Sequence, residues 1–310
     1  MGFAKRLISL LKDPSFIWRY FSRKGCLKWL NDETYIKHIY KIKFKKKLNL
    51  NNPVTFNEKL QWLKLNDRSF LYTIMVDKIK VKDYVSSFIG EDYIIPTLGV
   101  WRDAREIDFD NLPSKFVLKC NHDSSSIVFC RDKANFNKKK AIKKLNKFLK
   151  ANGYNYGREW PYKNVEKRIF AEPLLEDNDF KDKSLNVYKF LCFSGKPIII
   201  QTIQNDKTPE EVIDYFDDDW NLLNLRQNFP NSQKPLTRPK TLDKMLDISS
   251  KLSKGFPFLR VDLYEVNGKI YFSEFTFYSD DGMNKFVPED WDFKLGELID
   301  IEESERRRCL

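Results

Sequence analysis

The amino-acid sequence predicts a mixed α+β protein in which antiparallel hairpins lie beside separate helices. Three pairs of short apolar strands are each joined by a turn, and the clearest turn is Asn267-Gly268 in the run 258–282. Asn-Gly between two runs of alternating polarity is the strongest short-range signal of a hairpin. Apolar residues at helical spacing predict helices between the hairpins. A chain of 310 residues that is 42 % hydrophobic has room for two or three lobes.

Residues 1–50 are predicted to form a basic helical extension. They carry 13 Lys or Arg against three acids, which accounts for nearly all of the net charge of +11. Helices are expected within 1–12, 15–30 and 32–44, with a break at Asp13-Pro14. Such helices fit the inner-leaflet surface of a membrane, or a cap whose aromatic residues pack on the main body. No nucleic-acid-binding motif accompanies the charge, so no nucleic acid is expected as a partner.

Residues 51–114 are predicted to form an N-terminal lobe of two helices and a strand. Thr55 and Glu58 have the spacing of a capping box at the start of a helix over 56–65. A second helix is expected over 79–88, opened by Asp77-Lys78 and ended by Gly90. The run 93–100 is typical of a strand.

Residues 115–175 open with two strands and a serine-rich loop. Strands are expected over 116–121 and 127–130, and Lys119 lies near the end of the first, beside the loop 122–126. Backbone N–H groups and hydroxyls can hold phosphate oxygens there while the lysine supplies charge. A polar hairpin turn is the simpler alternative. The elements expected next are a helix over 138–150, a Gly- and aromatic-rich loop over 153–162, and a strand over 169–175 with Pro173 at an edge or hinge.

Residues 176–301 are predicted to hold two hairpins and two helices. A loop over 176–182 precedes strands 188–192 and 197–202, which turn at Ser194-Gly195. The polar stretch 204–239 is expected to be rich in turns, with Trp220 and Phe229 as anchors. Further elements are a helix over 242–252 with Thr241 as N-cap, the hairpin within 258–282, a closing helix over 290–301 and a frayed tail over 302–310.

The hairpin within 258–282 carries the most informative charges. Residues two apart on a strand share a face, so Arg260 and Asp262 point the same way. Pairing about the turn brings Asp262 close to Glu274. Two carboxylates beside an arginine in an apolar strand pair need a cation to neutralise them, and such oxygen ligands suit Mg²⁺. The alternative is a solvent-facing polar side on which Arg260 pairs with either carboxylate.

Composition excludes several kinds of chemistry. Only two histidines are present, His38 and His122, so histidine triads and multi-histidine metal sites are nearly excluded. Five cysteines are scattered without a CxxC pair, and neither a signal peptide nor a membrane-spanning apolar run is evident. This pattern predicts reduced thiols in a cytoplasmic protein, where Lys, Arg, Asp, Glu and a cofactor carry any reaction.

Eight phrases between residues 51 and 301 together carry a family resemblance. In chain order they read NPVTFNEKLQWLKL, VDKIKVKDYV, FVLKCNH, GREWPYKNVEKRIFAEPLLED, YKFLCFSGKP, DDDWNLL, KGFPFLRVDLYEVNGKIYFSEFTFY and PEDWDFKLGELI. A single phrase has little specificity, but their joint order is specific. The sequence resembles the TupA-like branch of the ATP-grasp superfamily, found with bacterial surface-polysaccharide genes. The resemblance implies an ATP-grasp fold in which two α+β subdomains, 115–175 (the lid) and 176–301, hold ATP between them.

The resemblance also implies roles for individual residues. Nucleotide phosphates and adenosine would be bound by Lys78, Lys119, Ser124, Ser125, Ser126, the hinge residues Glu172, Leu174 and Leu175, and Asp179. Asp262 and Glu274 would hold Mg²⁺. Arg260 and Lys119 would stabilise charge on the transferring phosphate. The loop after Lys119 is rich in glycine in the superfamily, whereas this loop contains none.

The implied activity is an ATP- and Mg²⁺-dependent carboxylate–amine ligase. It would activate a carboxylate as an acyl phosphate and attach an amino acid or amine to a uronic-acid-containing surface glycan, such as a capsule, or its precursor. Two alternatives stay open: a phosphotransferase to a sugar hydroxyl, and a catalytically impaired protein that binds nucleotide or glycan. The basic N-terminus suits an anionic glycan or a peripheral location at the inner face of the cytoplasmic membrane.

Overall fold

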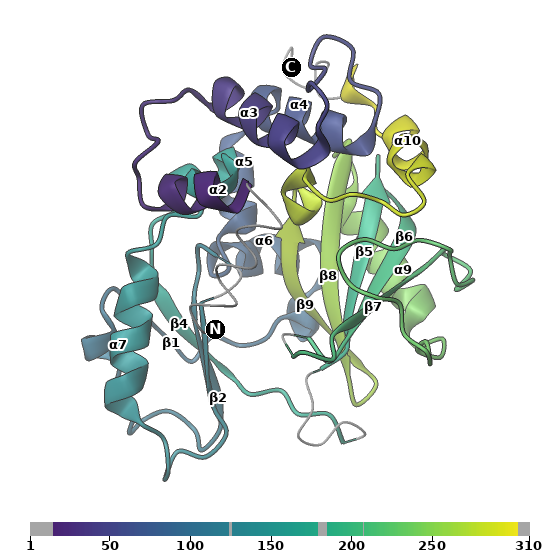
Figure 1. Cartoon of the computed structure of the whole chain (residues 1–310). Coiled ribbons are helices and arrows are strands. Elements are labelled where there is room, and N and C mark those ends of the chain that lie inside the picture. The colour runs from purple at the N-terminus through teal and green to yellow at the C-terminus, as the bar shows by residue number, and fades with distance from the viewer. Residues whose placement is uncertain (1–14, 124–125, 179–184, 207, 303–310) are drawn as a thin grey trace.

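A computed structural model of the chain describes residues 15–123, 126–178, 185–206 and 208–302 (Figure 1). The predictions for the first helix, Ser124, Ser125, Asp179 and the tail beyond residue 302 lie outside these ranges. The described chain forms two antiparallel sheets with helices packed around them (Figure 1). The predicted α+β class is confirmed.

The smaller sheet has four strands in the order β1-β4-β2-β3. These are β1 (Gly99–Trp101), β4 (Ile169–Pro173), β2 (Phe116–Cys120) and β3 (Ile127–Cys130), and helix α7 (Lys138–Leu149) packs against them. Leu145 of α7 is fully buried against Leu118 and the other apolar residues of this sheet. The predicted strands and helix of this region are confirmed. Pro173 ends an inner strand, beyond the last pair with β1, so its missing N–H breaks no ladder bond there.

Two local predictions in this half of the chain are wrong. The run 93–100 is not one strand, because Pro96 cannot donate to a ladder, and only Gly99–Trp101 pairs. Tyr93, the first residue of the predicted run, instead ends the 3-10 turn η1 (Glu91–Tyr93). The expected loop 153–162 instead contains a short helix α8 (Tyr154–Gly157) and a 3-10 turn η3 (Trp160–Asn164), which Pro161 favours near its start.

The larger sheet has five strands in the order β7-β6-β5-β8-β9. They are β7 (Val212–Phe216), β6 (Lys196–Gln204), β5 (Val187–Phe193), β8 (Phe258–Val266) and β9 (Lys269–Thr276). Both predicted hairpins are confirmed. Their turn residues all have positive φ, 46° and 82° at Ser194-Gly195 and 53° and 76° at Asn267-Gly268, as tight hairpin turns require.

Strand β7 lies in the stretch 204–239, which was expected to be polar and rich in turns, and no strand was predicted there. Four of its five residues are buried, including Asp214, so the alternation that marks a half-buried strand is absent. Trp220 does anchor this region, because its ring stacks on Phe216 with centroids 4.2 Å apart. Phe229 is 38 % exposed, so the prediction that it is an anchor is wrong.

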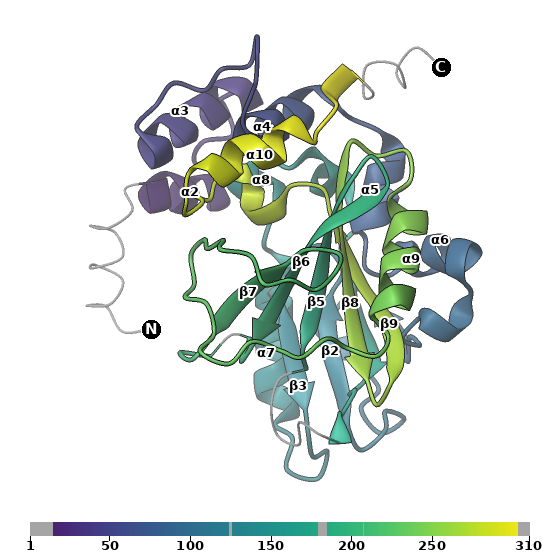
Figure 2. The ribbon, with the colours of Figure 1, turned by 90° about the vertical axis from the view of Figure 1, so that its right-hand side faces the viewer.

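Helices cover the ends and one face of the larger sheet (Figure 2). They are α4 (Phe56–Asn66), α5 (Phe70–Val76), α6 (Lys80–Ile89), α9 (Leu242–Ser253) and α10 (Asp290–Glu297). The capping box of Thr55 and Glu58 is confirmed, and Gly90 follows α6 as predicted. Thr241 takes the N-cap position of α9, but its side chain makes no capping bond. The predicted closing helix is shorter than expected.

The N-terminal extension packs onto the main body through α2 (Ser15–Arg23) and α3 (Asp32–Phe44). Helix α3 buries Tyr35, Ile36, Ile39 and Tyr40 beside Met283. The interpretation of this segment as a helical cap is therefore confirmed for α3. In the described part of the chain, no helix is both long and apolar enough to cross a bilayer.

Candidate active site

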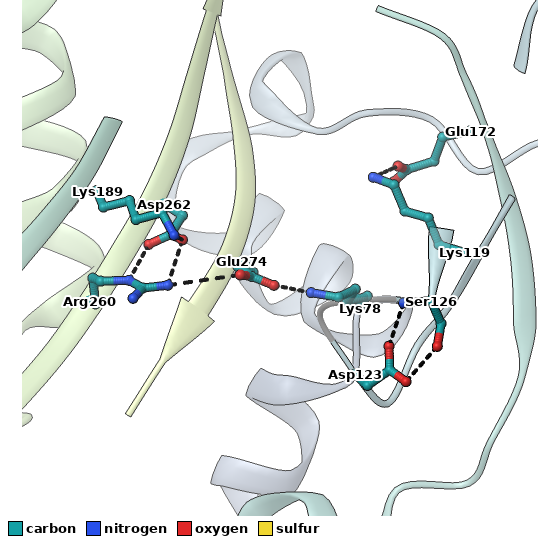
Figure 3. A network of polar contacts seen from close by, with 9 residues as sticks. All are labelled: Lys78, Lys119, Asp123, Ser126, Glu172, Lys189, Arg260, Asp262 and Glu274. Atoms are coloured by element: carbon teal, nitrogen blue, oxygen red, sulfur yellow. Dashed lines mark hydrogen bonds and ion pairs between the residues drawn. The ribbon is translucent and has the colours of Figure 1, made fainter. Parts of the chain in front are cut away.

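The hairpin β8–β9 places three charged side chains in one chain of contacts (Figure 3). Asp262 lies directly opposite Glu274 across the strand pair, and a bulge follows at the next position. Arg260 donates two hydrogen bonds to Asp262, of 2.7 Å from Nε and 2.9 Å from Nη2. Its Nη2 is also 3.9 Å from Glu274 Oε1. Arg260 and Asp262 are only 5 % and 2 % exposed, so the alternative of a solvent-facing polar side is wrong.

Two lysines extend this chain of charges. Lys78, at the start of α6, pairs with Glu274. Lys189 lies opposite Asp262 on β5, and its Nζ is 3.5 Å from Asp262 Oδ2. Burial alone would raise the pKa of Glu274, but Lys78, Lys189 and Arg260 outweigh burial and hold that pKa below its ordinary value. Glu274 is therefore ionised, and both hairpin carboxylates already lie beside positive charges.

A second ion-pair cluster lies on the smaller sheet, around Glu172. Its carboxylate accepts hydrogen bonds from Lys119 at 2.6 Å and from Lys82 at 2.5 Å. Burial would raise the pKa of Glu172, but the two ammonium groups outweigh burial and lower it. Sequence reasoning assigned only the backbone of Glu172 and missed Lys82. The four-residue spacing from Lys78 to Lys82 is the signal that could have indicated it.

The hinge residues Leu174 and Leu175 lie beyond the end of the pairing between β4 and β1. Strand β1 pairs with β4 only as far as Ala171, whereas β2 pairs as far as Pro173. The Leu174 N–H donates to the Lys115 carbonyl, on the β2 side, at 3.5 Å. Because successive residues of a strand point their N–H groups to opposite sides, Leu175 faces the side that β1 does not cover.

The loop after β2 is organised by Asp123. Its carboxylate accepts hydrogen bonds from the Ser126 N–H at 2.8 Å and from Ser126 Oγ at 2.5 Å. The Ser126 carbonyl in turn accepts from the Cys120 N–H at 3.0 Å. Ser126 is buried and is held by the loop itself in this conformation. Aspartate side chains commonly hydrogen-bond to nearby backbone N–H groups in turns, as Asp123 does here.

A cavity of about 720 Å³ opens beside the hairpin. Arg260, Glu274 and Lys189 line one wall, and Asp123 of the loop after β2 lines another. Arg19, from α2 of the N-terminal extension, also lines it. A second cavity of about 10 Å³ lies among Lys78, Lys82, Lys119 and Glu172. The large cavity can hold a small organic substrate, whereas the second is far too small for a nucleotide in this conformation.

The far wall of the large cavity is built around Asp281. Arg19 Nη1 lies 2.6 Å from Asp281 Oδ2, and the fully buried Lys64 lies 2.5 Å from Oδ1. Asp280 and Asp281 have φ values of 49° and 62°, which are strained for residues with a side chain. A Cβ on Gly157 would lie 2.3 Å from Asp281 Oδ1, so only glycine fits there.

Glu159 shares the cavity with this wall. Burial raises the pKa of Glu159, and the charge of Asp281 raises it further. Sequence reasoning singled out neither Glu159 nor the partners of Asp281. The interacting groups come from positions 19, 64, 159 and 281, and no local pattern in the sequence links them.

Asp262 and Glu274 have the chemistry of a magnesium site. Both supply carboxylate oxygens from neighbouring strands, which is the donor type that Mg²⁺ prefers. In the described part of the chain, no group of three or more His, Cys, Asp or Glu side chains could hold a metal ion. Mg²⁺ bound here would therefore take its other ligands from substrate phosphates and water, which is its usual behaviour in phosphate-binding enzymes.

The smaller sheet carries Lys119, helix α6 carries Lys82, and the larger sheet carries the carboxylate pair of Asp262 and Glu274. The chain belongs to the TupA-like ATPgrasp family, whose model matches residues 58–300. The expected family and fold are thereby confirmed.

The solved structures to which this chain is similar are distant in sequence. D-alanine–D-alanine ligase from Bacillus anthracis is 16 % identical with a TM-score of 0.44, covering 76 % of this chain and 69 % of that one. The same enzyme complexed with ATP is 17 % identical with a TM-score of 0.42, covering 76 % and 68 %. The Helicobacter pylori enzyme is 12 % identical with a TM-score of 0.41, covering 80 % and 68 %. No match is found among curated proteins.

Proposed function

We propose that this protein is an ATP- and Mg²⁺-dependent carboxylate–amine ligase. It attaches an amino acid or amine to a uronic-acid-containing bacterial surface glycan or to a precursor of that glycan. In this proposal residues 115–175 and 176–301 form the two ATP-grasp subdomains, and residues 51–114 form the preceding lobe. The reaction class is argued from the site geometry and the family, and the glycan is argued from the family alone.

One observation carries the proposal: Arg260 and Glu274 line a large cavity, and Asp262 lies directly opposite Glu274 on the neighbouring strand. The ion pairs at the two sheets involve five cations and three carboxylates: Lys78, Lys82, Lys119, Lys189 and Arg260, with Glu172, Asp262 and Glu274. This excess of positive charge suits a triphosphate. The nucleotide needs the lysines to move apart, because the space among them is now about 10 Å³.

The proposed reaction has two steps. A carboxylate oxygen of the acceptor first attacks the γ-phosphorus of ATP, and ADP leaves with the electrons of the broken P–O bond. The nitrogen of the amine then attacks the acyl carbon, inorganic phosphate leaves, and the nitrogen loses a proton. Neither step needs a nucleophile from the protein, which agrees with the shortage of histidine in the chain.

Charge stabilisation is the main contribution of the chain itself. Negative charge develops on the transferring phosphoryl oxygens and then on the oxygen of the tetrahedral intermediate. In the proposal Arg260 and Lys119 stabilise these charges, while Lys78 and the hinge residues position the nucleotide. Mg²⁺ held by Asp262 and Glu274 would neutralise charge on the phosphates. The guanidinium of Arg260 stays protonated, because Asp262 raises its pKa more than burial lowers it.

Isotope transfer tests the acyl-phosphate step directly. The full chain is incubated with Mg-ATP, an amino-acid mixture and an oligosaccharide whose glucuronic-acid carboxylate is labelled with ¹⁸O. The proposal predicts an amide product and inorganic phosphate that carries one labelled oxygen. A phosphorylated sugar with no amide would support the phosphotransferase alternative and overturn the ligase.

Mass spectrometry of the surface glycan complements this assay. The proposal predicts that a strain without this protein lacks an amide-linked substituent, and that the Asp262→Asn, Glu274→Gln double variant does not restore it. A strain that loses a glycan phosphate, or whose glycan is unchanged, contradicts the proposal.

A further inference from the structure

Helix α2 is packed with its polar side toward the protein. Arg19 and Ser22 are 7 % and 1 % exposed, whereas Ile17, Tyr20 and Phe21 are 42 %, 47 % and 48 % exposed. The usual order is the reverse, with apolar residues inside and charged residues in water. Trp18 packs against the apolar cluster around α3, but Ile17, Tyr20 and Phe21 remain about half exposed in the described structure.

Specific contacts hold the helix in this orientation. Arg19 pairs with Asp281 at 2.6 Å and lies over the ring of Tyr156, 4.8 Å from its centroid. Ser22 donates a hydrogen bond to the Asn155 carbonyl. Because these buried polar contacts fix the rotation of the helix about its axis, they also determine which residues point outward.

The outward residues form one surface, which we call the outer face of α2. Ile17, Tyr20, Phe21 and Lys24 follow the spacing i, i+3, i+4, i+7 and so lie on one side of a helix. The rings of Tyr20 and Phe21 are 5.8 Å apart, and Lys24 Nζ lies 5.9 Å from the Tyr20 ring centroid. Trp29, in the turn that follows, is 77 % exposed.

The charge around this surface has one sign. Residues 1–30 contain seven Lys or Arg and a single acid, Asp13. Lys24 and Lys28 are both exposed, and Lys24 lies beside the Tyr20 ring. Exposed Trp, Tyr and Phe with a surround of lysines are the combination that partitions into an anionic membrane interface.

We propose that the outer face of α2, together with Trp29, docks on a bilayer that contains anionic phospholipid. The aromatic rings enter the headgroup region, and Lys24 and Lys28 contact the lipid phosphates. The opposite side of α2 lines the large cavity through Arg19, so docking brings the cavity within about 10 Å, the diameter of one helix, of the lipid surface. Lipid binding is independent of the proposed ligase reaction, and either can fail without the other.

Co-sedimentation of the full chain with phospholipid vesicles tests this surface. We expect the protein to sediment with vesicles of phosphatidylcholine and phosphatidylglycerol, and to bind pure phosphatidylcholine and high-salt samples more weakly. The Tyr20→Ser, Phe21→Ser, Trp29→Ser triple variant should bind about tenfold more weakly or worse, because it removes the apolar area that enters the interface.

A matched control removes three equally exposed rings elsewhere. Phe70, Phe88 and Phe129 are 70 %, 54 % and 52 % exposed on other elements, and changing all three to serine should leave vesicle binding unchanged. The Lys24→Glu, Lys28→Glu variant keeps the aromatic residues and should lose binding only to the anionic vesicles. It provides the test if the aromatic variant fails to fold.

Several outcomes would overturn the proposal. Wild-type protein that stays in the supernatant with anionic vesicles contradicts it, as does an aromatic variant that folds and binds as well as wild type. Vesicle binding that appears only after removal of residues 1–14 would show that this segment covers the face. A dimer that dissociates in the aromatic variant, without vesicle binding by wild type, would assign the face to a second copy.

Discussion

Lys78 forms an ion pair with Glu274, 196 residues away in the chain. The lysine lies at the start of α6, beside the smaller sheet, because its N–H donates to the carbonyl of Asn121 at 3.2 Å. The carboxylate lies on β9 of the larger sheet, next to Arg260. One ion pair therefore connects the two halves of the candidate site, and Lys78 supplies charge to a carboxylate that we propose as a metal ligand.

We expect Mg-ATP to stabilise the wild-type protein and to leave the Asp262→Asn, Glu274→Gln variant nearly unaffected. At about 100 times its Kd a ligand stabilises the folded state by about 2.7 kcal/mol, which corresponds to a rise in Tm of about 4 °C for a chain of this size. Thermal unfolding with and without Mg-ATP measures the shift. The Asp110→Asn, Glu176→Gln variant, which changes exposed carboxylates, should keep it. An equal shift in the site variant would disprove nucleotide binding at these carboxylates.

Glu172→Gln should destabilise the fold strongly. It leaves Lys82 and Lys119 without their carboxylate in a site where Glu172 is 6 % exposed, and breaking a buried pair costs about 3 kcal/mol. Urea unfolding measures the free energy of unfolding. Glu176→Gln is the matched control, since its pair with Lys115 is about half exposed and should contribute less than about 1 kcal/mol. Similar decreases in the free energy of unfolding in both variants would contradict the conclusion that Glu172 is the centre of a buried ion-pair cluster.

Stability should also depend on pH through Glu172. Its pKa is lower in the folded state than the ordinary 4.5, so between the two values the unfolded state binds more protons. The stabilising contribution is complete above pH 4.5 and is lost as the pH falls through the folded-state pKa. The difference in free energy of unfolding between wild type and Glu172→Gln should therefore shrink as samples are acidified below that value. A difference that stays constant across the acid range would rule out this linkage.

Arg260→Lys should reduce kcat about 100-fold or more while changing the KM for ATP little. Lysine keeps the positive charge but cannot make the bidentate hydrogen bonds that Arg260 makes to Asp262. Charge in the transition state is therefore less well stabilised. ADP release in the complete ligase mixture measures the rate. Arg238→Lys is the control and should behave as wild type, because the Arg238 side chain is 44 % exposed in its ion pair with Asp243. An unchanged kcat in Arg260→Lys would remove this residue from the proposed catalytic group.

Gly157→Ala should destabilise the cavity wall by about 1–3 kcal/mol, because the added methyl group would lie 2.3 Å from Asp281 Oδ1. Helix propensity alone predicts the opposite sign, since alanine is the better helix former. Urea unfolding distinguishes the two. Gly153→Ala, where the closest heavy atom is the His122 carbonyl oxygen at 3.3 Å, should cost less. A stabilised Gly157→Ala variant would mean that the Asp281 side chain moves away from the methyl group without any loss of stability.

Several features could be predicted from the sequence because they depend on neighbouring residues. The Asn267-Gly268 turn sets the pairing of its own two strands as far as Leu263 opposite Phe272, and this part follows from local sequence. The bulge between Asp262 and Leu263 then brings Glu274, and not Ser273, opposite Asp262, and the turn does not predict that bulge. The capping box at Thr55 and Glu58 is likewise contained within four residues. The order of the family phrases also identified the family, and its model matches residues 58–300.

Only the tertiary structure determined which distant charges meet. Lys189 reaches Asp262 because β5 pairs with β8, and Lys82 of α6 meets Lys119 of the smaller sheet at Glu172. The same is true of Arg19 at Asp281, 262 residues away, and of the outward turn of the apolar side of α2. Local propensity sets turns, caps and single hairpins. The pairing of separate segments depends on how they pack, and no short pattern in the sequence encodes that packing.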